Sequence, residues 1–269
     1  MRVLGWCHNG YHMLPAAEIA RRARIAGLDG LIIKYGDPAF ERAITAEGIR
    51  WGVERFAYAH QAAREGDMLA DAIDAGAAFA VANCEPNDGG GWERADASPA
   101  IRTLIDTFRR RHPGAPLWIC ADLRRGRSLD APFIREAANG GVQGWMPMVY
   151  PKAFGQSVAA AFDAGFPGAT YLGLPCAPVL QAYDGIGAGV LLEQVFEAGR
   201  RGAAEASMYV VETASERELQ ALAWATAGRR ANALRDTALA YLRGAIALLD
   251  HGSAAALRDW AARFASDHG

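Results

Sequence analysis

Eight short apolar runs, each followed by a stretch of helical periodicity, extend through almost the whole chain and constrain its fold more than any other feature. The runs cover residues 2–7, 30–35, 51–59, 77–83, 117–121, 142–149, 170–174 and 207–211. Short apolar segments that alternate with helical segments are typical of parallel strands connected by helices. Eight such units predict a (β/α)8 TIM barrel of the α/β class, and the 269 residues of the chain are close to the roughly 250 that one such domain needs.

The main alternative is an open, doubly wound sheet, because periodicity alone does not close a sheet. Such a sheet normally carries a glycine-rich phosphate-binding turn after its first strand. Here residues 7–12 read Cys-His-Asn-Gly-Tyr-His and lack that turn. A glycine-rich segment at residues 185–189 precedes a helix and could hold a phosphate, but a flexible loop is the simpler interpretation. The closed barrel is therefore preferred.

The last helix of the barrel and the segments after it set the predicted domain boundary. Ser215 and Glu218 form a capping box ahead of an apolar run, so a helix is predicted to begin there. Two further amphipathic stretches follow and exceed what a barrel requires. We expect a barrel domain over residues 1–228. We expect extra C-terminal helices over residues 229–269, which pack on the barrel or form a surface for a homo-oligomer.

Composition limits the partners. The chain is 51% hydrophobic and 22% charged, with a formal net charge of -2. This balance allows a large core and shows no footprint of nucleic-acid or membrane-surface binding. The first strand begins directly at Arg2, and no apolar run approaches the roughly 20 residues that cross a bilayer. We expect a cytoplasmic protein with no nucleic-acid and no membrane partner; export by cell lysis or a phage route is the alternative.

The four cysteines do not define a metal site. Cys7, Cys84, Cys120 and Cys176 lie near predicted strand ends, and none belongs to a C-x-x-C pair. They could cluster at the barrel mouth around a metal, but small buried thiols that pack the barrel are the simpler interpretation. No metal and no other cofactor is predicted.

Chemistry in such barrels occurs where the strands end on their C-terminal side. Because side chains alternate inward and outward along a strand, each polar tip shares its face with the residues two and four positions earlier. Glu85 would thus face inward with Asn83, and Glu212 with Val210 and Met208. The groups predicted to converge are Glu85, Asp122, Tyr150 and Glu212, surrounded by His8, Lys34, His60, Asn83 and Asn87.

Paired carboxyl groups suggest a reaction. In a partly dry cleft they push one pKa upward, because both cannot be charged at low cost. One then donates a proton while the other stays ionised, which is the division of labour that glycosidic cleavage requires. We expect Glu85 as the general acid and Asp122 or Glu212 as the base or nucleophile, with Tyr150 and Asn83 positioning a sugar. The aromatic side chains expected to offer flat faces to sugar rings are Trp6, Tyr35, Tyr58, Trp92 and Tyr183.

Short motifs resemble those of glycoside hydrolase barrels. Asn83-x-Glu85 after the fourth strand resembles the Asp-x-Glu of family 25 lysozyme-like glycoside hydrolases, and also the Asn-Glu-Pro of the large clan of retaining barrels with one residue inserted. Met148-x-Tyr150 is similar to the Met-x-Tyr of chitinase-like barrels. Residues 31–37 are similar to the second strand of several glycoside-hydrolase-like proteins. The resemblance implies a barrel that acts on a carbohydrate substrate through Glu85.

The chain departs from these patterns at two places. Asn83 stands where the lysozyme-like pattern has aspartate, and an amide cannot act as a base or nucleophile. The predicted seventh strand has no acid where the retaining clan has a second glutamate. A second hypothesis is therefore a catalytically inactive glycan-binding or structural barrel, for example in a phage-derived assembly. A third is a metal-dependent hydrolase or isomerase, motivated by His8, His12 and His60.

Overall fold

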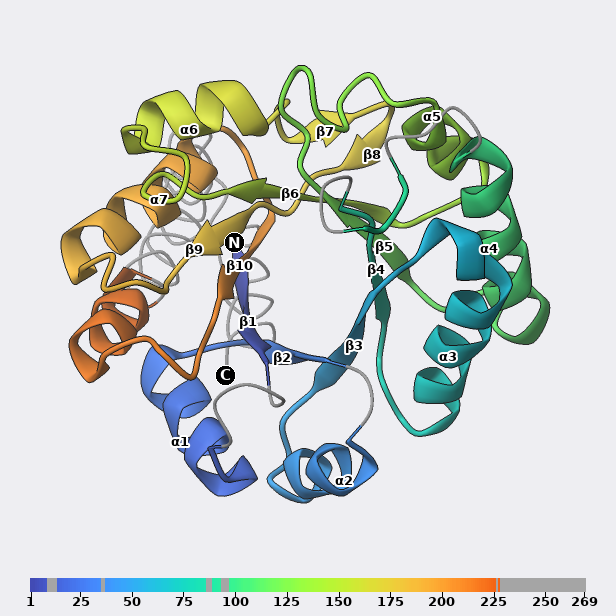
Figure 1. The fold of residues 1–269 in the computed structure, drawn as a ribbon. Coiled ribbons are helices and arrows are strands. Elements are labelled where there is room, and N and C mark those ends of the chain that lie inside the picture. Colours follow the sequence, from blue (N-terminus) through green and yellow to red (C-terminus); the bar gives the residue numbers. More distant parts are fainter. Residues whose placement is uncertain (9–13, 35–36, 86–88, 93–96, 226, 228–269) are drawn as a thin grey trace, which may run out of the picture. The chain divides into compact units, whose positions relative to one another are not determined.

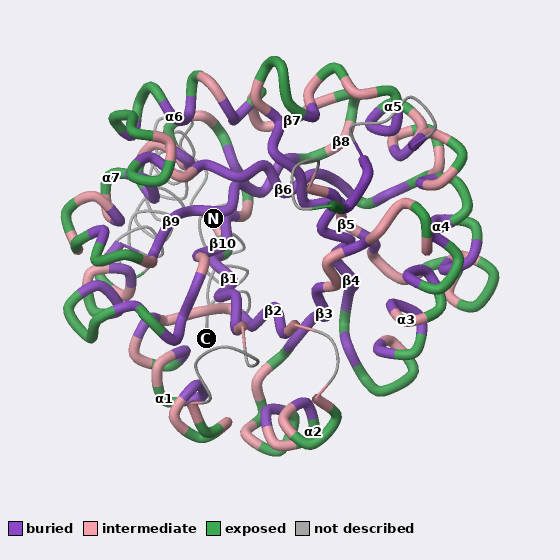
Figure 2. The backbone as a smooth tube through the Cα atoms, viewed as in Figure 1, coloured by how far each residue is buried: buried purple, intermediate pink, exposed green. Residues whose placement is uncertain are grey.

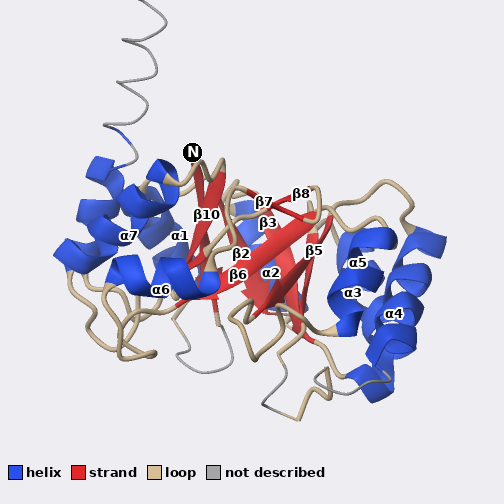
Figure 3. Ribbon diagram, turned by 90° about the horizontal axis from the view of Figure 1, so that it is seen from above, coloured by secondary structure: helices blue, strands red, loops and turns tan. Residues whose placement is uncertain are grey.

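The computed structural model describes residues 1–8, 14–34, 37–85, 89–92, 97–225 and 227. Eight parallel strands form one closed barrel in the order β1-β10-β9-β6-β5-β4-β3-β2, and helices surround it (Figure 1, Figure 3). The predicted (β/α)8 barrel is confirmed, and the open sheet is excluded.

Seven of the eight barrel strands lie within or overlap the apolar runs expected from the sequence. The barrel strands are β1 (Arg2–Cys7), β2 (Gly30–Lys34), β3 (Trp51–Phe56), β4 (Ala80–Asn83), β5 (Leu117–Ala121), β6 (Gly144–Val149), β9 (Val179–Gln181) and β10 (Glu205–Tyr209). The predicted ends differ mainly where an apolar run continues into the turn beside a strand. Tyr35, expected at the end of the second strand, lies outside the described residues.

The predicted seventh strand is wrong. Residues of that run form β7 (Thr170–Tyr171), which pairs in antiparallel fashion with β8 (Leu174–Pro175) outside the barrel. Leu172 and Gly173 connect them with φ of 49° and 77°. A tight turn with positive φ at both central residues has a backbone twist that matches the twist of the two strands it joins. The run therefore folds back on itself as a β-hairpin. The barrel strand in this position is β9, only three residues long.

Local capping signals mark the ends of several helices. They are α1 (Ala16–Ala26), α2 (Pro38–Ala46), the 3-10 helix η1 (Ala59–Gln61), α3 (Ala62–Asp74), α4 (Ala97–Arg111), α5 (Pro132–Asn139), α6 (Val158–Gly165) and α7 (Ala188–Arg200). Gly27 ends α1 in the left-handed conformation, and the Asp37 side chain accepts from Phe40 N at the start of α2. The capping box is confirmed, since Glu218 N donates to Ser215 Oγ at 3.2 Å and Ser215 N donates to Glu218 Oε2 at 2.6 Å.

Buried side chains form two layers. Figure 2 shows that the barrel strands are mostly buried and that exposed residues lie mainly in the outer helices and loops. On β1, Leu4 and Trp6 belong to the layer inside the barrel, whereas Val3 and Cys7 belong to the layer between strands and helices. The inner layer consists of Leu4, Trp6, Ile32, Phe79, Val81, Cys120, Met146, Met148, Ala177, Val179 and Val210. The inner layer fills the middle of the barrel. The inward side chains at the two ends of each strand can therefore line cavities.

The chain divides into two units, Met1–Thr226 and Ala227–Gly269. The predicted boundary at residue 228 and the predicted C-terminal helices lie outside the described residues, so both stay predictions. In the part of the chain that the structure describes, no helix is long and apolar enough to cross a membrane.

Close packing of α3 against α4 gives a test of the fold. A methyl group on Gly66 of α3 would lie 2.5 Å from the Leu104 carbonyl oxygen of α4, whereas one on Gly189 of α7 meets nothing within 4 Å. Gly66→Ala should therefore lower the free energy of unfolding by about 1–3 kcal/mol, although alanine favours helix. Gly189→Ala should raise it by about 0.5–1 kcal/mol. Urea denaturation of both variants measures the difference, and equal effects would contradict the packing.

Candidate active site

A cavity of about 590 Å³ lies at the C-terminal ends of the barrel strands. It is lined by Trp6, His8, Lys34, Glu54, Arg55, Phe56, Tyr58, Asn83, Glu85, Cys120, Met148, Tyr150 and Tyr209. This is the end at which barrel enzymes carry their chemistry, and the volume is within the usual range for small-molecule sites.

Glu54 is the site residue that the sequence analysis missed. It lies in the middle of β3, next to Lys34 of β2 in the strand register, and only 3% of it is exposed. The following residue, Arg55, donates to Glu65 of α3 at 2.6 Å, so the outer side of β3 faces the helices and Glu54 faces the cavity. Two adjacent charged residues, Glu54 and Arg55, inside an otherwise apolar run were the available signal. Because side chains alternate along Trp51–Phe56, one of the two must face the barrel interior.

Burial raises the pKa of Glu54 to about 7. The positive charge of Lys34 and a hydrogen bond from Asn83 oppose this rise, and the negative charge of Glu85 adds to it. Glu54 Oε2 is buried and has no hydrogen-bond partner among the described residues, which makes the ionised form costly. Glu54 therefore holds a proton up to near-neutral pH.

Asn83 connects the two carboxyl groups. Its Nδ2 donates to Glu85 Oε1 at 2.9 Å, and its side chain is only 8% exposed in the wall of the cavity. Asn83 Oδ1 is buried and finds no partner among the residues that the structure describes. Glu54, Asn83 and Glu85 thus form one polar cluster on neighbouring strands, with Glu85 half-buried beyond the tip of β4.

Aromatic rings make up much of the remaining wall. The Tyr209 ring meets Trp6 edge-on at 5.8 Å between centroids and lies 6.3 Å from Tyr150. Trp6 Nε1 donates to Ser207 Oγ at 2.8 Å, which fixes the indole. Burial raises the pKa of both Tyr150 and Tyr209 above the usual range, so both hydroxyls remain hydrogen-bond donors. The cavity can offer flat apolar faces and a few polar groups to a ligand.

Of the three predicted catalytic carboxyl groups, Glu85 lines the cavity and the other two are engaged elsewhere. Asp122 accepts from Arg124 Nε at 2.8 Å and Nη2 at 2.7 Å. Glu212 Oε1 accepts from Cys7 Sγ at 3.2 Å and from His8 N. Neither residue is among those that line the cavity.

The inward register predicted for the last strand is correct for Val210, which belongs to the inner layer, and wrong for Met208 and Glu212. Met208 belongs to the layer between strands and helices, and Tyr209 is the residue of β10 that lines the cavity. Ser207, on the same face, bonds to Trp6 of the inner layer. The face of this strand is set by its pairing with β1 and β9, which the sequence did not reveal.

The predicted ligand-binding residues separate into two groups. His8, Lys34, Asn83 and Tyr150 line the cavity, whereas His60 lies on η1, exposed and outside it.

Trp92 and Asn87 do not contribute to the observed cavity. Trp92 is fully buried, donates from Nε1 to Ala57 O at 2.7 Å and packs on Phe133, so it offers no face to a ligand. Asn87 lies outside the described residues, as does His12. Among the residues that the structure describes, no group of three or more His, Cys, Asp or Glu side chains is arranged to hold a metal ion.

Comparison with known proteins supports the fold class. No family model matches the chain, and no curated protein matches it in sequence. The chitinase RmChi1 of Rhizomucor miehei is similar with a TM-score of 0.59 and 10% identity, over 84% of this chain and 100% of that one. A chitinase of Chromobacterium violaceum ATCC 12472 gives a TM-score of 0.57 and 13% identity, over 84% of this chain and 99% of that one.

A sugar phosphate isomerase/epimerase of Parabacteroides distasonis ATCC 8503 is also similar, with a TM-score of 0.50 and 11% identity over 83% of this chain and 96% of that one. At these identities the likeness shows the fold alone. The chain shares the closed (β/α)8 barrel fold of these chitinases and of the isomerase/epimerase, and nothing in the comparisons supports the narrower resemblance to family 25.

The buried carboxyl group of Glu54 should make stability depend on pH. Its pKa is raised from 4.5 to about 7, so the folded state binds the proton more tightly than the unfolded state. Stability from this group is complete below the lower value and is lost as pH rises to the higher one. Glu54→Gln should therefore gain up to about 3 kcal/mol relative to the parent protein between pH 4 and pH 8.

Chemical denaturation across this pH range measures the gain. Glu193→Gln on the exposed side of α7 is the matched control. A pH-independent difference between Glu54→Gln and the parent would contradict the assignment.

Proposed function

We propose that this barrel is a glycoside hydrolase that cleaves a glycosidic bond in a poly- or oligosaccharide by carboxyl acid–base catalysis. The observation that carries the proposal is the cluster of Glu54, Asn83 and Glu85 in one aromatic-walled cavity at the C-terminal end of the barrel. Two carboxyl groups with different environments supply both the proton and the negative charge that this reaction needs.

Glu54 and Glu85 form one electrostatically coupled pair. Because the negative charge of Glu85 raises the pKa of Glu54, the two lose their protons in separate steps and the pair holds a single proton near neutral pH. In the reactive form of the pair its single proton is on Glu85, which lies at the tip of β4 and has more exposed surface than Glu54. Glu85 then delivers this proton to the glycosidic oxygen. Glu54 is 3% exposed and acts as a positioning residue beneath it.

The remaining steps balance with water alone. The bond between the anomeric carbon and the leaving oxygen breaks as that oxygen takes the proton from Glu85. A water molecule supplies the hydroxyl group to the anomeric carbon, and its second proton returns to the carboxyl pair. Positive charge that develops on the sugar ring is stabilised by the carboxylates, while Tyr150 and Asn83 orient the ring through their hydrogen-bonding groups.

Asp122 and Glu212, expected as partners of Glu85, receive supporting roles instead. The Arg124 guanidinium that Asp122 holds lies 3.5 Å from the ring centroid of Phe154, which packs against Tyr150. Glu212 accepts from the backbone of His8 and so fixes that residue at the mouth. Each acts through a residue that lines the cavity or packs against one.

Replacing the acid tests the assignment. Glu85→Gln preserves size but cannot donate a proton, so release of reducing ends should fall at least about a hundredfold. The substrates are a panel of polysaccharides that includes chitin oligosaccharides and peptidoglycan. Glu193→Gln, on the exposed side of α7, should retain full activity. Equal activity of Glu85→Gln and the parent protein would refute the role of Glu85.

The pH profile tests the role of Glu54 separately. In the parent protein, activity should fall as pH rises through about 7, because the pair then loses its last proton. In Glu54→Gln the repulsion is gone, so the alkaline limb should move to lower pH. A limb that stays in place would show that Glu54 is only structural.

A second candidate function is glycan binding without hydrolysis. Asn83, where lysozyme-like barrels have aspartate, favours it, since an amide supplies no second base. If the protein only binds glycans, an oligosaccharide should bind saturably to the parent protein and no reducing ends should be released. The same panel, followed by calorimetry, distinguishes the two functions.

A further inference from the structure

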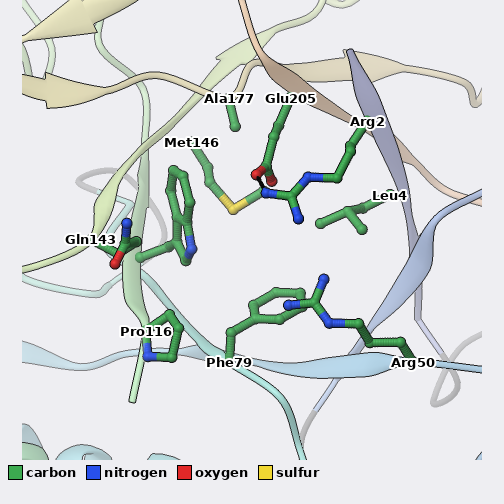
Figure 4. A pocket seen from close by; sticks show the side chains of 10 residues that line it. Arg2, Leu4, Arg50, Phe79, Pro116, Gln143, Met146, Ala177 and Glu205 are labelled. Carbon is green, nitrogen blue, oxygen red and sulfur yellow. Dashed lines mark hydrogen bonds and ion pairs between the residues drawn. The ribbon is translucent and has the colours of Figure 1, made fainter. Parts of the chain in front are cut away.

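A second, smaller cavity of about 160 Å³ lies at the opposite end of the barrel, where the strands begin. Figure 4 shows its lining side chains, which come from the starts of the strands and the turns before them. They are Arg2, Leu4, Arg50, Phe79, Pro116, Trp118, Gln143, Met146, Ala177 and Glu205. None of these residues lines the larger cavity.

The inner part of this cavity is apolar. Leu4, Phe79, Met146 and Ala177 belong to the layer inside the barrel, and Trp118 packs against it. The cavity, at about 160 Å³, is large enough to hold one molecule the size of benzene. The floor therefore suits a single compact ring or a short branched hydrocarbon.

The mouth of the cavity carries charge. Arg2 forms an ion pair with Glu205, so its charge is already balanced (Figure 4). The Arg50 guanidinium lies 5.3 Å from the centroid of the Phe79 ring, directly beside the apolar floor. Within the described residues, its guanidinium forms no hydrogen bond and no ion pair. Arg50 thus presents a fork of donors at the edge of a ring-sized apolar space.

We propose that this cavity binds a small organic monoanion: a compact apolar ring that bears one carboxylate. The ring fills the floor between Phe79 and Met146, and the carboxylate accepts two parallel hydrogen bonds from Arg50. Because Arg2 and Glu205 neutralise each other, the one remaining positive charge, that of Arg50, matches a ligand with a single negative charge. The site is independent of the proposed hydrolytic activity, since it shares no residue with that cavity.

Titration with benzoate tests the proposal, followed by protein NMR and calorimetry. Benzyl alcohol supplies the ring without the charge, and acetate supplies the charge without the ring. Benzoate should bind saturably at one site, and both comparison compounds should bind at least about tenfold more weakly. Failure to saturate, or equal binding of benzyl alcohol, would overturn the proposal.

Three variants locate the site. Arg50→Gln, at an exposed position, should weaken benzoate binding about tenfold while leaving benzyl alcohol unchanged. Ala177→Leu, which fills the floor, should abolish binding of both. Glu85→Gln, in the other cavity, should bind benzoate like the parent protein. Unchanged affinity in Arg50→Gln, or lost affinity in Glu85→Gln, would place benzoate elsewhere and refute the site; Arg50→Gln decides this even if Ala177→Leu does not fold.

Discussion

Closure of the sheet is the constraint on which every other feature of this protein depends. Once eight parallel strands form a barrel, alternate side chains must point inward, and those at the C-terminal tips must meet around one opening. Glu54, Asn83 and Glu85 become neighbours for this reason, although they lie on two strands separated by a helix. The aromatic residues from β1, β6 and β10 reach the same cavity by the same rule.

The carboxyl cluster at the C-terminal end of the barrel lowers the free energy of unfolding, and packing elsewhere in the fold must offset this loss. A carboxyl group that is 3% exposed, with an oxygen lacking a partner in the described part of the chain, opposes folding whenever it is ionised. Lys34 and Asn83 reduce that cost without removing it, since the pKa of Glu54 remains near 7. A buried carboxyl group with a raised pKa is typical of functional sites, where activity is retained at the expense of stability.

The two ends of the barrel differ in chemical character. The C-terminal cavity joins carboxyl groups to tyrosine and tryptophan rings, whereas the smaller cavity joins arginine side chains to an apolar floor. The inner layer, which includes Val81 and Cys120, lies between them and is built from the same inward alternation. One packing rule therefore generates two chemically distinct environments in a single domain.

Local sequence determined the alternation of strands and helices, the approximate positions of seven strands and the capping box of Ser215 and Glu218, because periodicity and capping are properties of neighbouring residues. Strand alternation also placed Glu85, Asn83 and Tyr150 at the C-terminal tips. Tertiary structure alone decided that β9 is the seventh strand, that Tyr209 rather than Glu212 faces the cavity, and that Glu54 joins Glu85. Strand choice, inward face and the pKa of a buried acid depend on partners distant in the chain. No local pattern encodes those partners.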